Sequence, residues 1–182
     1  MNFAATHISG VAIIEPKVFE DARGYFFESY SKAEFAANGI EAEFVQDNQS
    51  KSAYGTIRGL HFQKFEHAQA KLARVIDGRV LDIAVDLRTG SPTYGRHVAV
   101  ELSAENNRML FIPRGFAHGF SVLSATAVFA YKCDNPYDRL SEGGIAYDDP
   151  ELGIDWKIPA GSRILSEKDL NHPKFKEVGT CF

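Results

Sequence analysis

The side chains best suited to chemistry gather in residues 46–63, which read QDNQSKSAYGTIRGLHFQ. Within this stretch Gln46 and Asn48 offer amide groups, Arg58 offers a cation, and His61 can gain or lose a proton near neutral pH. Taken singly, His61 could be a satisfied core histidine and Arg58 a surface charge. Because these groups are concentrated in one short stretch, we interpret it as one wall of an active site.

A histidine that acts as a general acid or base needs a group that orients it and a place for the charge that it creates. The carboxylates that could orient an imidazole are Asp82, Asp86 and Asp169. Lys71 and Arg58 could stabilise an oxyanion, and Tyr131 could return a proton. The sequence has no GxSxG elbow, no P-loop and no dinucleotide-binding glycine fingerprint. Acyl transfer, phosphate-loop chemistry and hydride transfer therefore lack their usual signals, whereas proton transfer remains.

The composition excludes several classes of protein. The chain has 182 residues, 45% of them hydrophobic and 24% charged, so we expect a single globular domain over residues 1–182. No apolar run approaches the roughly 20 residues of a transmembrane helix, and the N-terminus lacks the pattern of a secretory signal. Cys133 and Cys181 are expected to be free thiols. A net charge of -4 argues against nucleic acid as a partner. We therefore expect a cytoplasmic protein with neither a membrane nor a nucleic acid as partner.

Short strands are the elements that must position these groups. Alternating or short apolar segments predict strands over residues 10–15, 25–30, 57–63, 71–76, 79–87, 97–102, 109–112, 120–123 and 127–132, with another that begins at 43–46. Asp77-Gly78 is the strongest hairpin signal. A capping-box pattern at Ser31 and Glu34, with Asn38-Gly39 as a stop, predicts one short helix. Evenly spaced short strands with little helix favour an antiparallel sandwich or barrel.

The strand over residues 57–63 has to break its regular alternation. Arg58 and His61 have opposite parity, so a regular strand would point them to opposite faces. Gly59 lies between them and tolerates an irregular backbone, so we predict a bulge or a twist there. Lys71 could point into a pocket or into solvent. Further along, we expect a flexible loop at NPYDRLSEGG and a capped helical turn at SEKDLNHP.

The segment PRGFAHGF resembles the Pro-x-Gly-x-x-His signature of the cupin superfamily. This resemblance implies an all-β jelly roll, a double-stranded β-helix, with a few short peripheral helices. Metal-binding cupins carry a His-x-His pair with a carboxylate upstream, whereas this chain reads His61-Phe62-Gln63. We therefore expect no metal site.

Five motifs occur together and in order: DARGYFFE, QDNQSKSAYGTIRGLHFQ, QAKLARVIDGRVLDIAVDLRTGSPTYG, IPRGFAHGF and ILSEKD. They resemble the dTDP-4-dehydrorhamnose 3,5-epimerase family from about Gly10 to Pro173. The resemblance implies a cofactor-free isomerase that inverts C3 and C5 of dTDP-4-dehydro-6-deoxy-D-glucose to give dTDP-4-dehydro-L-rhamnose. Three alternatives stay open: a related epimerase that inverts one centre or takes another nucleotide-linked 4-keto sugar, a metal-dependent cupin enzyme, and a carbohydrate-binding jelly roll without catalysis.

The resemblance also implies roles for individual residues. His61 is the base, Asp169 orients it, Lys71 lies near the C4 oxyanion and Tyr131 is the acid on the opposite face. The positions implied to bind the dTDP-linked 4-keto-6-deoxy sugar are Arg23, Phe26, Glu28, Gln46, Asn48, Arg58, His118, Tyr137, Glu142 and Lys168.

Two of these positions have implied contacts of their own: Arg58 meets the diphosphate and Tyr137 stacks on thymine. Alternatively, Phe26 could be a core residue and His118 could be held for packing. The family also implies a homodimer whose N-terminal strands, about residues 1–30, cross between subunits. Arg23 and Phe26 would then serve the neighbouring site.

Overall fold

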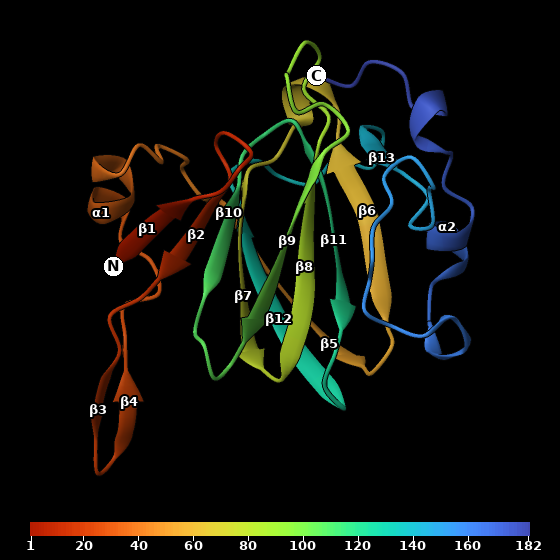
Figure 1. The fold of residues 1–182 in the computed structure, drawn as a ribbon. Coiled ribbons are helices and arrows are strands. Elements are labelled where there is room, and N and C mark those ends of the chain that lie inside the picture. Colours follow the sequence, from red (N-terminus) through yellow and green to blue (C-terminus); the bar gives the residue numbers. More distant parts are fainter.

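Two antiparallel sheets pack face to face in the computed structural model, which describes residues 1–182 (Figure 1). The six-stranded sheet has the spatial order β1 (Asn2–Ala5), β2 (Ala12–Glu15), β10 (Met109–Ile112), β7 (Lys71–Asp77), β12 (Thr126–Cys133) and β5 (Gln46–Ala53). The five-stranded sheet has the order β13 (Glu142–Gly144), β6 (Ile57–Gln63), β11 (Phe116–Val122), β8 (Arg79–Asp86) and β9 (His97–Ser103).

The remaining elements are short and lie outside the two sheets. A hairpin of β3 (Phe19–Asp21) and β4 (Gly24–Phe26) projects from the body of the molecule (Figure 1). The helices are α1 (Lys32–Ala37), α2 (Glu167–Leu170) and three 3-10 turns at Phe65–His67, Ala160–Ser162 and Phe175–Glu177. None of these helices is long and apolar enough to cross a membrane.

The chain passes back and forth between the two sheets. From β5 to β8, and again from β9 to β13, each strand belongs to the sheet opposite its predecessor. This path is that of a double-stranded β-helix, so the predicted cupin-type jelly roll is confirmed.

The predicted hairpin at Asp77-Gly78 is wrong, because consecutive strands here alternate between the two sheets. β7 and β8 lie in different sheets, so the chain crosses from one layer to the other at Gly78. Gly78 has φ +78°, and a Cβ there would lie 2.1 Å from the carbonyl oxygen of Thr126. A glycine is needed for this crossing as it would be for a tight hairpin turn, which explains why the local signal misled.

The core has three parts. Apolar side chains from both sheets fill most of the space between them, among them Val80 and Ala84 of β8 and Phe129 of β12. The other face of β8, with Leu81 and Ile83, packs against the C-terminal segment. A third cluster joins α1 to the outer face of the six-stranded sheet. Because β8 is buried on both faces, its polar residues must find partners inside the protein.

Four local predictions need correction. Helix α1 forms, but the Ser31 side chain caps nothing, and the Glu34 carboxylate pairs with the N-terminal amine. The strand expected over residues 25–30 ends at Phe26. The strand expected over residues 120–123 begins earlier, at Phe116, where pairing with β8 extends it. The loop expected at NPYDRLSEGG contains β13, which pairs with β6.

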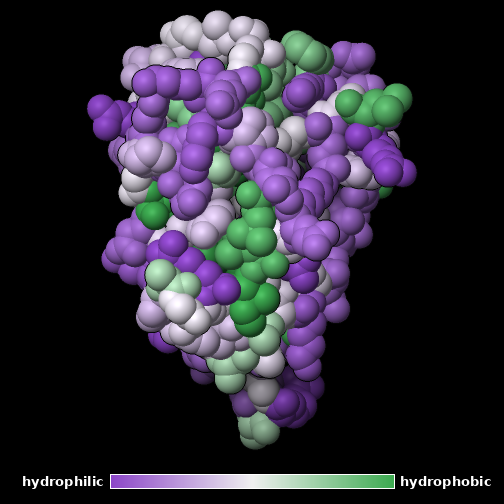
Figure 2. Space-filling view, turned by 90° about the vertical axis from the view of Figure 1, so that its right-hand side faces the viewer, coloured by the Kyte–Doolittle hydropathy of each residue, from purple (hydrophilic) through white to green (hydrophobic).

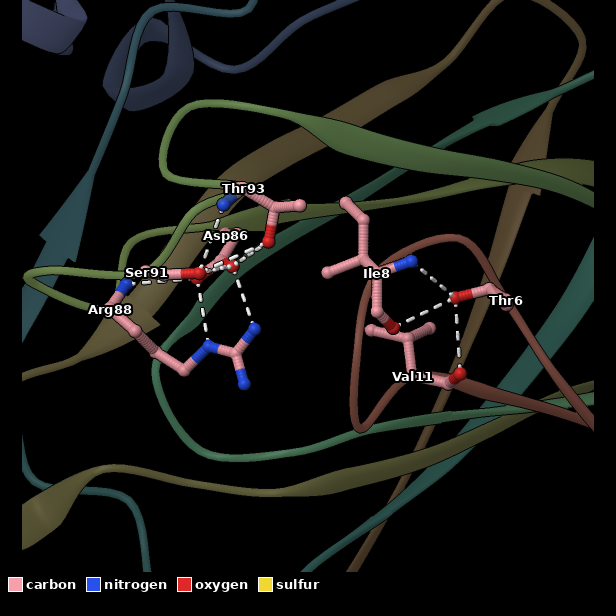
Figure 3. Close-up of polar contacts among 7 residues, drawn as sticks. All are labelled: Thr6, Ile8, Val11, Asp86, Arg88, Ser91 and Thr93. Atoms are coloured by element: carbon pink, nitrogen blue, oxygen red, sulfur yellow. Dashed lines mark hydrogen bonds and ion pairs between the residues drawn. The ribbon is translucent and has the colours of Figure 1, made fainter.

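Side-chain hydrogen bonds fix two loops of the barrel (Figure 3). Asp86 is fully buried and accepts hydrogen bonds from Arg88, Ser91 and Thr93 at 2.6–3.0 Å. Burial alone would raise the pKa of the Asp86 carboxyl, but these hydrogen bonds lower it well below its usual range. Asp86 therefore holds a loop and orients no imidazole. On the other loop, Thr6 Oγ1 contacts the backbone of Ile8 and Val11.

The surface that carries α2 and the C-terminal segment is largely hydrophilic, with a vertical strip of hydrophobic residues near its centre and smaller hydrophobic patches toward the top (Figure 2). The molecule narrows in this view toward the projecting hairpin at the bottom. The hairpin exposes aromatic side chains, with Phe19 54%, Tyr25 61% and Phe26 70% exposed. Aromatic groups this exposed on a projecting hairpin point to a contact with another surface.

Candidate active site

A cavity of about 280 Å³ opens between the two sheets. Six residues singled out in the sequence line it: Asn48, Arg58, His61, Lys71, His118 and Tyr131. The five-stranded sheet contributes His61 from β6 and His118 from β11, and the six-stranded sheet contributes Lys71 from β7 and Tyr131 from β12. The cavity therefore has two chemically different walls.

Gly59 makes it possible for Arg58 and His61 to share this cavity. Along the pairing of β6 with β11, His118 is opposite His61 and Phe120 is opposite Arg58, so two residues of β6 face the single Gly119. Gly59 has φ +133°, and a Cβ there would lie 2.6 Å from Gly119 Cα. The predicted bulge at Gly59 is confirmed, because only a glycine fits this close approach of two strands.

His61 and Asp169 form a pair although they are 108 residues apart in the sequence. His61 Nε2 lies 2.5 Å from Asp169 Oδ1, and the side chains are 32% and 5% exposed. Burial alone would raise the pKa of Asp169, but the hydrogen bond and charge of His61 outweigh it and lower this pKa. The ionised carboxylate accepts the Nε2 proton, so the His61 Nδ1 lone pair is left to take a proton from a ligand.

Asp169 owes its position to helix α2. The Ser166 hydroxyl accepts a hydrogen bond from the Asp169 backbone N–H at 3.1 Å, which caps the first turn of the helix. This confirms the capped helical turn predicted at SEKDLNHP.

His118 and Asp82 form a second pair inside the same cavity wall. His118 Nε2 lies 2.6 Å from Asp82 Oδ1, with the side chains 6% and 0% exposed. Burial lowers the pKa of His118 despite the nearby carboxylate, which favours the neutral imidazole. Asp82 was one of the carboxylates considered for orienting His61, and it orients His118 instead. His118 lies within strand β11.

Lys71 and Tyr131 face these histidines from the opposite sheet. Lys71 shares a face of β7 with Ala73 and Val75 of the inner core, so it points into the cavity and not into solvent. Its Nζ lies 5.6 Å from the centre of the Tyr131 ring. Burial lowers the pKa of the Lys71 ammonium and raises that of the Tyr131 phenol. The wall thus combines a poorly hydrated cation with a phenol that keeps its proton.

Polar groups at the cavity edge are held in place by neighbouring side chains. Arg58 Nε donates to Ser52 Oγ at 3.1 Å, which leaves the rest of its guanidinium free for an anion. Gln46 donates to Asn48 Oδ1 at 3.0 Å and accepts from the backbone N–H of Tyr137 at 3.0 Å. Ser52 was not identified from the sequence, where nothing distinguishes it from other serines.

Three further predicted residues form a linked group beside the cavity. Tyr137 donates to Glu142 at 3.1 Å, and Glu142 also forms an ion pair with Lys168. Glu142 and Lys168 line a neighbouring hollow of about 360 Å³ together with His172. The Tyr137 ring is 52% exposed and is therefore accessible to a ligand.

The structure does not bring Arg23, Phe26 and Glu28 to the cavity of their own chain. Arg23 follows the projecting strand β3 and pairs with Asp21, with its side chain 90% exposed. Phe26 is not a core residue, because its side chain is 70% exposed. None of the three residues lines the cavity between the sheets.

Comparison with known proteins identifies the family of this chain. The sequence model of the family described as dTDP-4-dehydrorhamnose 3,5-epimerase matches residues 5–177. The chain belongs to this epimerase family. A curated relative named dTDP-4-dehydrorhamnose 3,5-epimerase, from Shigella flexneri, is 52% identical over 179 residues, covering 98% of each chain.

Solved structures of the family are also similar. The dTDP-4-dehydrorhamnose 3,5-epimerase of Elizabethkingia anophelis superimposes with a TM-score of 0.93 at 56% identity, covering 97% of each chain. The dTDP-6-deoxy-D-glucose-3,5-epimerase of Legionella pneumophila, in complex with dTDP-4-keto-L-rhamnose, superimposes with a TM-score of 0.94 at 48% identity, covering 97% of this chain and 94% of the other. Membership of the epimerase family makes this protein an isomerase-class enzyme.

Sequence reasoning also missed His172, which lies beside the His61–Asp169 pair. It follows α2, lies three residues after Asp169, and its ring packs edge-on against His61 with 5.5 Å between ring centres. The helical spacing from Asp169 was the signal that could have found it. His61, Asp169 and His172 are also the one group of side chains here that could hold a metal ion. Gln63, at the cupin metal-ligand position, instead accepts a hydrogen bond from the Asp138 backbone at 2.9 Å.

Proposed function

We propose that this protein inverts C3 and C5 of dTDP-4-dehydro-6-deoxy-D-glucose and gives dTDP-4-dehydro-L-rhamnose. The observation that carries the proposal is the pairing of His61 with Asp169 on one wall of the cavity, with Lys71 and Tyr131 on the other. Inversion requires that a proton leave one face of a carbon and another arrive at the opposite face. Two walls that differ in this way suit a base and an acid acting on opposite faces.

The first step removes a proton next to the C4 ketone. His61 Nδ1 takes the hydrogen of C3 or C5 as a proton. The electron pair of the broken C–H bond then forms a carbon–carbon double bond to C4, and the carbonyl electrons move to the oxygen. Asp169, 2.5 Å from Nε2, stabilises the resulting imidazolium. Because the ketone lies between C3 and C5, the same base serves both centres.

The second step returns a proton to the opposite face. Lys71 stabilises the enolate oxygen, and its burial strengthens that attraction because little water competes for the charge. Tyr131 then donates its phenolic proton to the carbon from the six-stranded sheet. Afterwards His61 loses its proton and Tyr131 regains one by exchange with water, which resets the site for the next centre. These steps require no cofactor.

The predicted binding residues suit the nucleotide part of this substrate. We place the diphosphate against Arg58, whose guanidinium has free N–H groups at the cavity edge. The exposed ring of Tyr137 would stack on thymine, and Gln46 holds the backbone of Tyr137 in place. Asn48, His118, Glu142 and Lys168 supply further polar contacts around the sugar and the phosphates.

We further infer that two copies of the chain form a dimer in which the β3–β4 hairpin of one completes the cavity of the other. Arg23, Phe26 and Glu28 lie outside their own cavity, and the hairpin exposes three large aromatic side chains. A cation and an aromatic ring are the groups that a nucleoside diphosphate needs. Both buried cysteines are free, as in reducing compartments, and this supports a cytoplasmic location.

Mixing two inactive variants tests the shared site. His61→Asn removes the base and Arg23→Glu reverses the charge of the hairpin. If the sites are shared, a mixed dimer carries one intact site, and activity returns to on the order of one quarter of the parent's. A mixture that stays inactive, although ion-exchange chromatography separates a mixed dimer from both homodimers, would contradict the exchange of hairpins.

Product analysis in deuterated water tests the proposed reaction. We expect NMR to show inversion and deuterium at both C3 and C5, because each centre receives its new proton from a group that exchanges with solvent. Label and inversion at a single centre would identify an epimerase of one centre and reject the proposed double inversion.

A further inference from the structure

His172 has an unusual environment for a histidine. Its side chain is 10% exposed, and its Nε2 atom is buried without a hydrogen-bond partner. Nε2 lies 3.4 Å from Asp169 Oδ1 but lacks hydrogen-bond geometry. The ring is held against Gly144, where a Cβ would lie 2.3–2.5 Å from its atoms. A buried nitrogen that has no hydrogen-bond partner and lies close to a carboxylate suggests a ligand not yet assigned.

The surrounding groups match the ligands of a transition metal. One nitrogen each from His61 and His172 and one carboxylate oxygen of Asp169 all lie within 4.8 Å of one another. Around tetrahedral Zn²⁺, with bonds of about 2.0–2.2 Å, neighbouring ligand atoms are about 3.3 Å apart. The contact of His172 with Asp169 already has this spacing, at 3.4 Å. The contact of His61 with Asp169, at 2.5 Å, has to open by less than about 1 Å.

We propose that His61, Asp169 and His172 bind a divalent transition metal such as Zn²⁺, and that the bound metal inhibits the enzyme. Two imidazoles and one carboxylate favour Zn²⁺ and Co²⁺ over Mg²⁺ and Ca²⁺, which prefer oxygen ligands. Three protein ligands leave one tetrahedral position for water. This ligand set differs from the His-x-His set of metal-binding cupins, and no step of the epimerisation uses it.

Inhibition follows from which ring nitrogen of His61 carries the proton, and it rests on the proposed role of His61 as the base. In the free enzyme the single proton of neutral His61 is on Nε2 and is donated to Asp169, so Nδ1 can accept a proton. A metal ion bound to Nε2 uses that lone pair, and the proton moves to Nδ1. The nitrogen that would attack the substrate hydrogen is then occupied. Metal binding and catalysis therefore exclude each other.

Two measurements on four proteins test this site. Activity is measured at increasing Zn²⁺, and Co²⁺ binding is followed by the absorption band of tetrahedral Co²⁺. The proteins are the parent, His172→Phe, His172→Gln, and His67→Phe as a control at a partly exposed histidine outside this group. We expect Zn²⁺ to inhibit the parent and His67→Phe, with recovery on chelation. Both His172 variants should bind metal at least about 100-fold more weakly, since even outer-shell partners are worth 10- to 100-fold.

Each protein is compared with itself in the absence of metal, so any change in its basal rate cancels. Equal Zn²⁺ inhibition of the parent and both His172 variants would overturn the site. Co²⁺ binding through His172 without inhibition would overturn the inhibitory role. A parent that inverts both centres but binds no Co²⁺ rejects the metal site and keeps the proposed function. If the parent binds metal through His172 but the His61→Asn variant is fully active, the metal site stands and the assignment of His61 as the base is rejected.

Discussion

The two histidine–aspartate pairs of the cavity have nearly the same hydrogen bond but different surroundings. His61 lies 2.5 Å from Asp169, and His118 lies 2.6 Å from Asp82. The His61 side chain is 32% exposed, whereas that of His118 is 6% exposed. Asp169 comes from a short helix far along the chain, whereas Asp82 lies in a strand paired with that of His118. The accessible pair can exchange a proton with a substrate and with water. The buried pair instead keeps a fixed imidazole at the wall of the cavity.

Their electrostatics support the same division. Burial lowers the pKa of His118, so this imidazole stays neutral and offers a constant face to the cavity. One oxygen of Asp82 is buried without any hydrogen-bond partner, so the carboxylate depends on His118. We therefore assign catalysis to the first pair and the shape and stability of the cavity wall to the second.

The largest expected effect is the loss of activity in His61→Asn. General-base catalysis is worth about 10² to 10⁴, so turnover should fall by at least that factor. The free energy of unfolding should change little, because Asn can still donate to Asp169. Turnover by NMR and unfolding by urea check the two parts. A variant that keeps more than a tenth of the parent's turnover would reject the assignment of catalysis to the His61–Asp169 pair.

For the buried pair we expect the opposite outcome. His118→Phe leaves the Asp82 carboxylate buried with no partner, and should lower the free energy of unfolding by about 3 kcal/mol. The double variant with Asp82→Leu should regain most of that loss, because removing both polar partners leaves nothing unsatisfied. Equal stability of the single and the double variant in urea unfolding would show that the unpaired Asp82 carboxylate is not the cause of the loss.

The pH dependence of stability gives a smaller effect. Because the pKa of His118 is lowered on folding, the unfolded chain binds more protons below its ordinary pKa of about 6.5. The free energy of unfolding should therefore be highest above about pH 6.5 and fall as the pH drops, by at most about 1.4 kcal/mol per pH unit from this group. His97 and His172, whose pKa values burial also lowers, add to the slope.

The His118→Phe, Asp82→Leu double variant is the control for this pH effect. Urea unfolding of the double variant should show a shallower slope than the parent between about pH 6.5 and 5. The same slope in both proteins would mean that His118 binds its proton equally well in the folded and the unfolded chain.

The smallest effect concerns the helix that carries Asp169. Ser166→Ala removes the cap of α2 and should cost about 1 kcal/mol, much of it local to this turn. Activity should fall by a modest factor while the His118 pair is unaffected. Hydrogen exchange at the Asp169 amide, compared with amides of β8, measures this difference. Faster exchange in both places would show that the two pairs are not independent.

Part of this arrangement could be predicted from local chemistry. Opposite parity at Arg58 and His61, with Gly59 between them, demands an irregular strand, and the bulge is there. The turn at Ser166 and its capping also follow from adjacent residues. Such features depend on a few neighbouring positions, so the sequence contains the information that decides them.

Other features depend on partners that are distant in the chain. Asp77-Gly78 has the local chemistry of a hairpin, but the choice between a hairpin and a crossing of sheets depends on which strands β7 and β8 pair with. The residues alone left open which carboxylate orients which histidine, and only the family resemblance pointed to Asp169 for His61. The pairing of Asp82 with His118 became evident once the strands were placed. His172 gained its role only from contacts with His61 and Gly144. Arg23 stands apart from its own cavity, which no local pattern could reveal.

The central claim is that the base and the acid act from opposite walls of the cavity. Its most direct test is the reaction of Tyr131→Phe in deuterated water. His61 should still remove the C3 and C5 protons, exchange them with solvent through its exposed edge, and return deuterium to the same face. We therefore predict recovered substrate that gains deuterium with its original configuration, while inverted product falls by about 10²-fold or more. Inverted product at the parent's rate, or recovered substrate without deuterium, would contradict the assignment of base and acid to opposite sheets.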